Sequence, residues 1–286
     1  SAASDVYKRQ IVDEASMLDI SLFYHLLCAL KDGARLILVG DIDQLPPVGA
    51  GEPLKDLMSW GYVPIVRLKR IFRQEEGSGI VENAALIRKG EMCVPDEAGE
   101  FRIIYAADDE DAYRIVMDLC RELNYGNEEN KMLLQVLSPM YRGVCGVDHL
   151  NESLQEMIHG EKVPDGMKFF PGDKVMQTRN DYEKGIYNGD VGTVWTATPQ
   201  KVFVRYFDKE VVYEGEERFD LRLAYAVTVH KSQGSEYETV IFILRPSQHN
   251  MLQRNLLYTG VTRARKNTIL VTAPDALRRA LAIQHT

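Results

Sequence analysis

The chain has 286 residues, which is enough for two domains at about 150 residues each. Hydrophobic residues make up 45% of it and charged residues 27%, values that exclude a fibrous or wholly disordered protein. The formal net charge of −8 excludes a protein that coats DNA or anionic lipid through its overall charge, but it leaves room for a local basic groove.

Cellular location is indicated by three patterns in the sequence. The apolar stretches, such as Leu36–Val39 and Val240–Leu244, are far shorter than the roughly 18 residues that cross a bilayer, so no membrane span is expected. The N-terminus lacks the charged and then apolar pattern of a secretory signal. The four cysteines form no Cys-x-x-Cys pair and predict neither a zinc site nor a disulfide framework. We therefore expect a cytoplasmic protein.

The N-terminal part of the chain predicts a parallel strand–helix–strand unit. Residues 1–10 are polar and aperiodic, and they are interpreted as a leader foreign to the fold, because a buried strand needs more apolar residues before Ile11. Helical spacing of apolar residues predicts an amphipathic helix over Met17–Leu30, and Arg35–Val39 predicts the next strand. This order is typical of an α/β sheet.

The rest of the chain alternates between α/β and all-β patterns. Helices are predicted at Ile80–Arg88 and Asp109–Leu123, before a buried strand at Met132–Leu137. Short alternating segments between Pro171 and Arg222 predict a small all-β insertion. The α/β pattern then returns, with a helix predicted at Leu252–Thr262 and strands at Ala224–Val229, Thr239–Leu244 and Thr268–Thr272.

Polar side chains follow the first two predicted strands, at the edge where open α/β sheets bind ligands. Asp13 is suited to hold Mg²⁺, and Glu14 to orient and deprotonate an attacking water. Gln44 follows the second strand, and its amide can bond both water and a phosphate oxygen. Each pattern alone also fits a solvated strand end or a polar turn, but their combination favours a nucleotide site.

The motifs resemble those of superfamily 1 helicases, in particular the RecD-like group that includes the exodeoxyribonuclease V alpha chain. The similarity covers nearly everything after Gln10. The matching segments are DEAS at 13–16, GDIDQLPPVGAG at 40–51, LKRIFRQ at 68–74, VLSPMYRGVCGVDHLN at 136–151, GDKVMQTRNDYEKGIYNGDVG at 172–192, AYAVTVHKSQGSEYETV at 224–240 and NLLYTGVTRARK at 255–266.

The first motif of that family, a Gly-rich loop ending in Gly-Lys-Thr that holds phosphates, has no counterpart, because the chain contains no Gly-Lys dipeptide. The sequence is therefore interpreted as a fragment of a longer protein. The resemblance implies an α/β fold of two RecA-like P-loop NTPase domains, the first incomplete, with an SH3-like β-barrel inserted in the second. We expect the first domain at 11–72, the second at 73–164 and 223–286, and the barrel at 165–222.

The resemblance also implies which residues surround ATP. Arg73 and Arg263 match positions that reach the γ-phosphate, where a guanidinium stabilises negative charge. They are predicted to act in catalysis with Glu14 and Gln44, and Glu236 matches a contact to the nucleotide ribose. ATP and Mg²⁺ are the expected cofactors, with Asp13 as the metal ligand.

Single-stranded DNA is the expected partner. Thr228 and His230 follow a predicted strand and are expected to contact DNA, His230 by stacking. Ser138, Tyr141 and Arg142 follow another strand and are expected to face DNA as well, although packing in the core is an equally good interpretation of Tyr141.

Two tyrosines and an asparagine of the predicted barrel, Tyr182, Tyr187 and Asn188, can either line the path of the DNA or pack inside the domain. We expect packing, above all for Tyr187.

These expectations combine into an ATP-dependent DNA helicase that translocates on single-stranded DNA. The resemblance implies 5′ to 3′ movement, a role in recombination and repair, and partner subunits of an exodeoxyribonuclease V-type complex. Two alternatives stay open. The first is a catalytically inactive DNA-binding remnant without the phosphate loop. The second is a nuclease, which is disfavoured because no further carboxylate cluster suggests a two-metal site.

Overall fold

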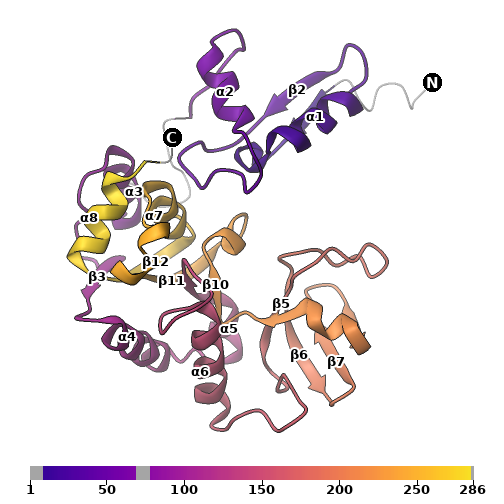
Figure 1. The fold of residues 1–286 in the computed structure, drawn as a ribbon, viewed down its shortest axis with the longest axis vertical. Coiled ribbons are helices and arrows are strands. Elements are labelled where there is room, and N and C mark those ends of the chain that lie inside the picture. The colour runs from indigo at the N-terminus through magenta and orange to yellow at the C-terminus, as the bar shows by residue number, and fades with distance from the viewer. Residues whose placement is uncertain (1–8, 69–77, 285–286) are drawn as a thin grey trace.

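The computed structural model describes residues 9–68 and 78–284, which form three parts (Figure 1). The first part, residues 9–68, contains two parallel strands. The side chains of both strands are exposed or only half-buried. Its elements are β1 (Arg9–Val12), a 3-10 turn (Ala15–Met17), α1 (Ile20–Ala29), β2 (Arg35–Leu38) and α2 (Pro53–Trp60). The predicted parallel strand–helix–strand unit is confirmed by the pairing of β1 with β2.

The first strand begins two residues earlier than expected. Arg9 pairs with Arg35 and Gln10 pairs with Leu36, so the predicted boundary between leader and fold after Gln10 is wrong. The polar residues are tolerated because β1 is largely exposed rather than buried between layers. Helix α1 in turn begins late, because the side chain of Asp19 caps it by accepting from Leu22 N at 2.7 Å.

The second part is a five-stranded sheet whose neighbouring strands are all parallel, in the order β10-β4-β11-β12-β3. Its strands are β3 (Phe101–Tyr105), β4 (Leu134–Ser138), β10 (Ala226–Thr228), β11 (Tyr237–Leu244) and β12 (Ala264–Thr272). Its helices are α3 (Gly79–Lys89), α4 (Asp109–Glu122), α5 (Glu128–Leu133), α6 (Val147–His159), α7 (Arg254–Val261) and α8 (Pro274–Ala282), with 3-10 turns at His230–Ser232 and Pro246–Met251.

Both faces of this sheet are buried. Phe242 and Leu244 of β11 belong to the core formed with α3, α7 and α8, whereas Ile241 and Ile243 belong to the core formed with α4 and α6. Alternate side chains of a strand point to opposite faces, and a parallel sheet is normally covered on both. The second part is therefore an α/β domain, as the sequence predicts, with helices on both faces of its parallel sheet.

The third part is an antiparallel sheet in the order β8-β7-β6-β5-β9, around a core that includes Phe169, Val194 and Val204. Its elements are β5 (Lys174–Gln177), β6 (Val191–Ala197), β7 (Lys201–Arg205), β8 (Glu210–Glu214), a 3-10 turn (Gly215–Asp220) and β9 (Leu221–Leu223). Because β9 includes Leu223, this β-domain extends one residue past its expected end. The boundary expected at 72/73 lies outside the described residues.

No helix within residues 9–68 and 78–284 is long and apolar enough to cross a membrane.

A buried lysine lies where the β-domain joins the parallel sheet. Lys174 is 1% exposed, and its Nζ donates to Leu134 O at 3.2 Å and to Gln135 Oε1 at 2.9 Å. Burial, reinforced by the charge of Lys131, lowers the pKa of Lys174 from 10.5 to about 7. A neutral amine has two N–H donors, which match the two acceptors.

The stability of the chain is therefore expected to rise with pH above neutrality. The unfolded chain keeps the Lys174 proton up to about pH 10.4, whereas the folded chain releases it above about pH 7. The unfolded state thus binds more protons in this interval, and the free energy of unfolding rises by up to about 1.4 kcal/mol per pH unit. Denaturant titrations at neutral pH and about one unit higher should show this rise in the wild type but not in Lys174→Met; equal rises in both proteins would contradict it.

Candidate nucleotide and nucleic-acid site

The two acidic residues lie directly after β1. Asp13 is exposed, and its Oδ1 accepts from Glu14 N at 2.9 Å. Glu14 has φ 50°, in the left-handed region that residues other than glycine rarely adopt. This conformation breaks the alternation of the strand and starts the 3-10 turn, so the neighbouring carboxylates need not point to opposite faces.

The loop Gly40–Leu45, which follows β2, lies directly against this acidic loop. Ala15 N donates to Val39 O at 2.8 Å, at the point where the two loops leave their strands. A Cβ atom at Gly40 would lie 2.8 Å from Ser16 N, closer than real Cβ atoms come to other atoms. Glycine is therefore needed at position 40 for the two loops to touch.

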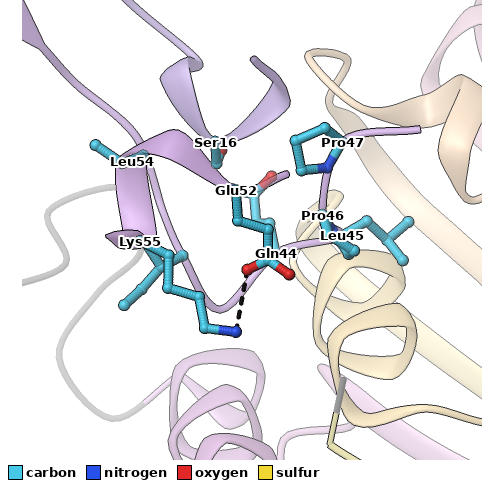
Figure 2. A pocket seen from close by; sticks show the side chains of 9 residues that line it. Ser16, Gln44, Leu45, Pro46, Pro47, Glu52, Leu54 and Lys55 are labelled. Carbon is cyan, nitrogen blue, oxygen red and sulfur yellow. Dashed lines mark ion pairs between the residues drawn. The ribbon is translucent and has the colours of Figure 1, made fainter. Parts of the chain in front are cut away.

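A small pocket opens between this loop, the acidic loop and α2 (Figure 2). Its volume of about 20 Å³ has room for about one water molecule. The lining residues are Ser16, Ile42, Gln44, Leu45, Pro46, Pro47, Glu52, Leu54 and Lys55. Figure 2 shows Gln44 beside Glu52, whose carboxylate pairs with Lys55 Nζ at 3.0 Å.

One polar atom of this pocket lacks a partner. The hydroxyl of Ser16, a residue only 9% exposed, has no hydrogen-bond partner among the described residues. An unpaired buried hydroxyl costs free energy, so the pocket favours a polar ligand atom at this point. Gln44 carries a second polar group there, in a half-buried position.

The carboxylate oxygens at this site also fit Mg²⁺ as a ligand. The described residues contain no group of three or more His, Cys, Asp or Glu side chains that could hold a metal alone. Magnesium is usually bound through one or two carboxylates together with phosphates and water, rather than by an all-protein cage. The exposed carboxylate of Asp13 meets that need.

Helix α7, from the second sheet, holds the Gly40–Leu45 loop. The three hydrogen bonds run from Tyr258 Oη to Asp41 Oδ2 (2.9 Å), from Asn255 Nδ2 to Gln44 O (2.9 Å) and from Leu45 N to Thr259 Oγ1 (2.8 Å). The three helix residues are spaced i, i+3 and i+4 and so share one face. Burial and the charge of Asp41 raise the pKa of Tyr258, which keeps its hydroxyl a donor.

Packing and charge strengthen the same junction. Leu45 is 3% exposed and belongs to the core that α3 and α7 form with the parallel sheet. Arg88 Nε of α3 lies 2.6 Å from Asp43 Oδ2, and Gln233 Nε2 donates to Leu45 O at 3.4 Å. Residues far apart in sequence thus fix this loop, and sequence analysis did not single them out.

Two other residues predicted to complete the ATP site, Arg263 and Glu236, bond other groups of the protein instead of lining this pocket. Arg263 is 3% exposed, and its guanidinium donates to Thr259 O and Ser235 O, each at 3.2 Å. It therefore points inward to backbone carbonyls instead of lining the pocket. Glu236 pairs with Arg265 Nε at 2.7 Å. The prediction for Arg73 lies outside the described residues.

Two of the five predicted DNA contacts are buried. Ser138 and Thr228 are paired neighbours at the ends of β4 and β10, and they are 0% and 4% exposed. The Ser138 hydroxyl donates to Cys145 O at 2.6 Å, and the Thr228 hydroxyl accepts from Lys231 N at 3.2 Å. The prediction that these two side chains face DNA is corrected: their hydroxyls bond the backbone of the loops that follow the strands.

The other three predicted DNA contacts are accessible. Tyr141 is 41% exposed, and Arg142 is also exposed. His230 is half-buried, and burial lowers its pKa, so the imidazole is neutral at pH 7 and above. A neutral ring can stack on a base but cannot neutralise a phosphate.

The β-domain adds exposed aromatic and basic groups to this surface. Tyr182 and Tyr187 are 77% and 49% exposed, with ring centroids 6.1 Å apart in an edge-to-face pair, so the prediction that they pack in the core is wrong. Lys231 Nζ donates to Asn188 Oδ1, and the Arg222 guanidinium lies over the Tyr141 ring. These contacts join the β-domain to the loops after β4 and β10.

Three family models match parts of the chain. The AAA domain matches residues 3–103, the SH3 domain of ATP-dependent RecD-like DNA helicases matches 150–206, and the UvrD-like helicase C-terminal domain matches 223–271. Together they span all three parts of the fold.

Relatives that align with nearly the whole of this chain agree with these family models. The ATP-dependent RecD2 DNA helicase of Deinococcus radiodurans is 38% identical over 282 residues, which cover 97% of this chain and 38% of the relative. The chain is thus similar to the RecD-like group of superfamily 1 helicases. A second member, the RecBCD enzyme subunit RecD of Mycolicibacterium smegmatis, is 32% identical over 96% of this chain and 51% of its own length. The chain thus spans about half, or less, of these relatives.

Solved structures show the same fold. The Pif1 helicase from Bacteroides in complex with ADP-AlF3 and ssDNA has a TM-score of 0.57 and 20% identity, over 96% of this chain and 72% of that one. The Pif1 helicase from Candida albicans has a TM-score of 0.56 and 19% identity, over 97% and 74%. With the family matches, these likenesses confirm the predicted RecA-like α/β fold with an SH3-like domain inserted in its second sheet domain.

Proposed function

We propose that the chain is the part of an ATP-dependent DNA helicase that links an ATP site to single-stranded DNA, with 5′ to 3′ movement in recombination and repair. The observation that carries this proposal is the set of hydrogen bonds between the Gly40–Leu45 loop and α7. A shift of this loop at the nucleotide changes its contacts with the second sheet domain directly. Closure of a hinge between two domains is a common way to convert ligand binding into movement.

In this proposal Asp13 holds Mg²⁺, Glu14 orients and deprotonates the attacking water, and Gln44 contacts the γ-phosphate. Magnesium, when bound, neutralises charge on the phosphate oxygens. The orphaned Ser16 hydroxyl and the exposed Asp13 carboxylate support this placement.

Arg73 and Arg263 are proposed to stabilise charge on the γ-phosphate, and Glu236 to contact the ribose. Arg263 must exchange its two carbonyl partners for phosphate, and Glu236 must share or release Arg265. Both exchanges fit a site that forms only when the domains close on a nucleotide.

We further propose a cytoplasmic location and, as partners, nuclease or helicase subunits of an exodeoxyribonuclease V-type complex. Relatives named RecBCD enzyme subunit RecD support the second point.

Single-stranded DNA is proposed to contact Tyr141, Arg142 and His230, together with Tyr187 of the β-domain. Replacing His230 with alanine should weaken binding of a fluorescent oligo-dT about tenfold, because one stacked base is worth about 1–3 kcal/mol. The slope of log affinity against log salt should stay unchanged, since a neutral ring displaces no counterion. Fluorescence anisotropy at several salt concentrations measures both quantities.

Two control variants sharpen this test. Arg142→Ala, which removes an exposed cation among the proposed contacts, should reduce the salt slope by about one, as expected for a lost phosphate contact. His25→Ala, an exposed histidine on α1, should change neither quantity. A His230→Ala protein that binds DNA as the wild type does would contradict the proposed contact.

The second candidate function is DNA binding without ATP turnover, and the inward orientation of Arg263, whose guanidinium bonds two backbone carbonyl oxygens, favours it. ATP binding, ATP hydrolysis and DNA binding measured on the same preparation separate the two. Hydrolysis stimulated by single-stranded DNA supports the helicase. DNA binding without nucleotide binding supports the second candidate, and a chain that binds neither contradicts both.

A further inference from the structure

A single carboxylate ties the β-domain to the parallel sheet domain. Asp173, the residue before β5, is completely buried and accepts four hydrogen bonds. Its Oδ2 accepts from Gln155 Nε2 (2.5 Å) and Phe170 N (2.7 Å), and its Oδ1 accepts from His159 Nε2 (2.8 Å) and Tyr225 Oη (2.9 Å). Four donors use the full capacity of a carboxylate.

The four donors come from three places in the chain. Gln155 and His159 lie on α6 of the parallel sheet domain, Phe170 N is in the segment that enters the β-domain before β5, and Tyr225 lies on the segment that leaves it. The His159 ring also stacks on Phe170, with centroids 4.4 Å apart. The carboxylate is therefore shared by α6 and by both connections of the β-domain.

The two connections are themselves paired. Ala224 N donates to the carbonyl oxygen of Lys174 at 2.8 Å, and Val175 pairs with Leu223 in the β5–β9 ladder. Tyr225 is fixed further, because its carbonyl oxygen accepts from Tyr125 Oη at 2.7 Å. The two connections are thus hydrogen-bonded to each other as a short two-stranded ribbon, which restricts rotation of the β-domain about either one. Asp173 bonds this ribbon to α6.

The orientation set at this joint decides where the exposed tyrosines lie. Strand β5 runs from Lys174 to Gln177, and Gln177 O accepts from Gly189 N at 2.9 Å, in the turn that follows Tyr187. The neighbouring Asn188 in turn bonds Lys231, beside His230. A continuous path of chain and hydrogen bonds therefore leads from Asp173 to the place where the β-domain meets the loop after β10.

We propose that Asp173 is a positioning residue, which holds the β-domain so that Tyr187 and His230 grip the same stretch of single-stranded DNA. This inference rests on the proposed function. Asp173 itself touches no DNA: buried in the joint, it acts only through the domain that it holds.

The test uses binding of oligo-dT of about 16 nucleotides, a length in the range that small β-barrel domains engage. Asp173→Asn keeps the size of the side chain but replaces one carboxylate oxygen with an NH2 group. This group then faces two hydrogen-bond donors, from which it cannot accept. We expect about tenfold weaker binding, as for Tyr187→Ala alone. In the Asp173→Asn background, Tyr187→Ala should then have little further effect, while His230→Ala keeps its full effect.

A compensating variant separates positioning from general damage. Asp173→Asn combined with Gln155→Glu exchanges amide and carboxylate across their hydrogen bond, so it should restore at least part of the affinity. Hydrogen exchange of the β6 and β7 amides checks that the β-domain stays folded. If it unfolds in Asp173→Asn, Tyr225→Phe removes just one of the four bonds and must show the same masking of Tyr187→Ala.

The outcomes are distinct. Wild-type affinity in Asp173→Asn, or losses that multiply with those of Tyr187→Ala, would overturn the positioning role and leave the proposed function standing. A wild-type chain that does not bind the oligonucleotide would overturn both. Masking of Tyr187→Ala with rescue by Gln155→Glu supports the inference.

Discussion

In a form of the protein that hydrolyses ATP, replacing Glu14 with glutamine is expected to lower turnover by about 10²- to 10⁴-fold while ATP affinity stays nearly unchanged. The amide cannot accept the proton of the attacking water, but it has the shape of the carboxyl group. The left-handed turn at position 14 and the hydrogen bond from its backbone N–H to Asp13 are main-chain features that the substitution retains.

Asp13→Asn is the contrasting variant. It weakens the proposed metal ligand, so it should reduce the Mg²⁺-dependent part of ATP affinity as well as turnover. Single-turnover hydrolysis and equilibrium binding of a fluorescent ATP analogue, each with and without Mg²⁺, separate the two effects. Normal turnover in Glu14→Gln would remove Glu14 from the role of base.

The second large effect is expected from Leu45→Ala. Truncating a buried leucine costs about 2–5 kcal/mol, and Leu45 is the side chain that residues 9–68 insert into the core of the second domain. A two-stranded sheet is marginally stable alone, and no residue of α1 is buried. Losing this anchor should therefore release β1 and β2 from the rest of the chain.

Hydrogen exchange followed by mass spectrometry measures this release. Amides of β1 and β2 should exchange much faster in Leu45→Ala, whereas those of the central strands β4 and β11 should change less. Val48→Ala is the matched control, since Val48 is apolar, three residues away and 93% exposed. Equal exchange of β1 in the two variants would show that Leu45 is not the anchor.

The strands of the fold were predictable because each leaves a local pattern. A continuous apolar run, Val240–Leu244, marks β11, which is buried on both faces, and alternation marks β7 and β8 of the β-domain. The start of β1 was missed because an exposed strand needs no apolar run. Its pairing with β2, not its composition, makes Arg9 and Gln10 part of the sheet.

The site was predictable in its chemistry but less so in its geometry. Motif residues such as Ser138 and Arg263 have the side chains that DNA or phosphate would need, yet here they bond backbone carbonyls nearby. Sequence does not show which partner a polar side chain takes. The contacts of α7 were missed since they join segments far apart in the chain, although the spacing of Asn255, Tyr258 and Thr259 on one helix face was visible.

The strand order of the second domain has a consequence for how the chain folds during synthesis. Strand β3 pairs only with β12, and β4 lies between β10 and β11, so this sheet cannot close until its last strand has left the ribosome. All five strands of the β-domain are made before β10. The inserted domain can thus complete its local, antiparallel contacts early, while β3 and β4 wait for distant partners. The Asp173 joint then forms beside a finished module, around which the parallel sheet is assembled.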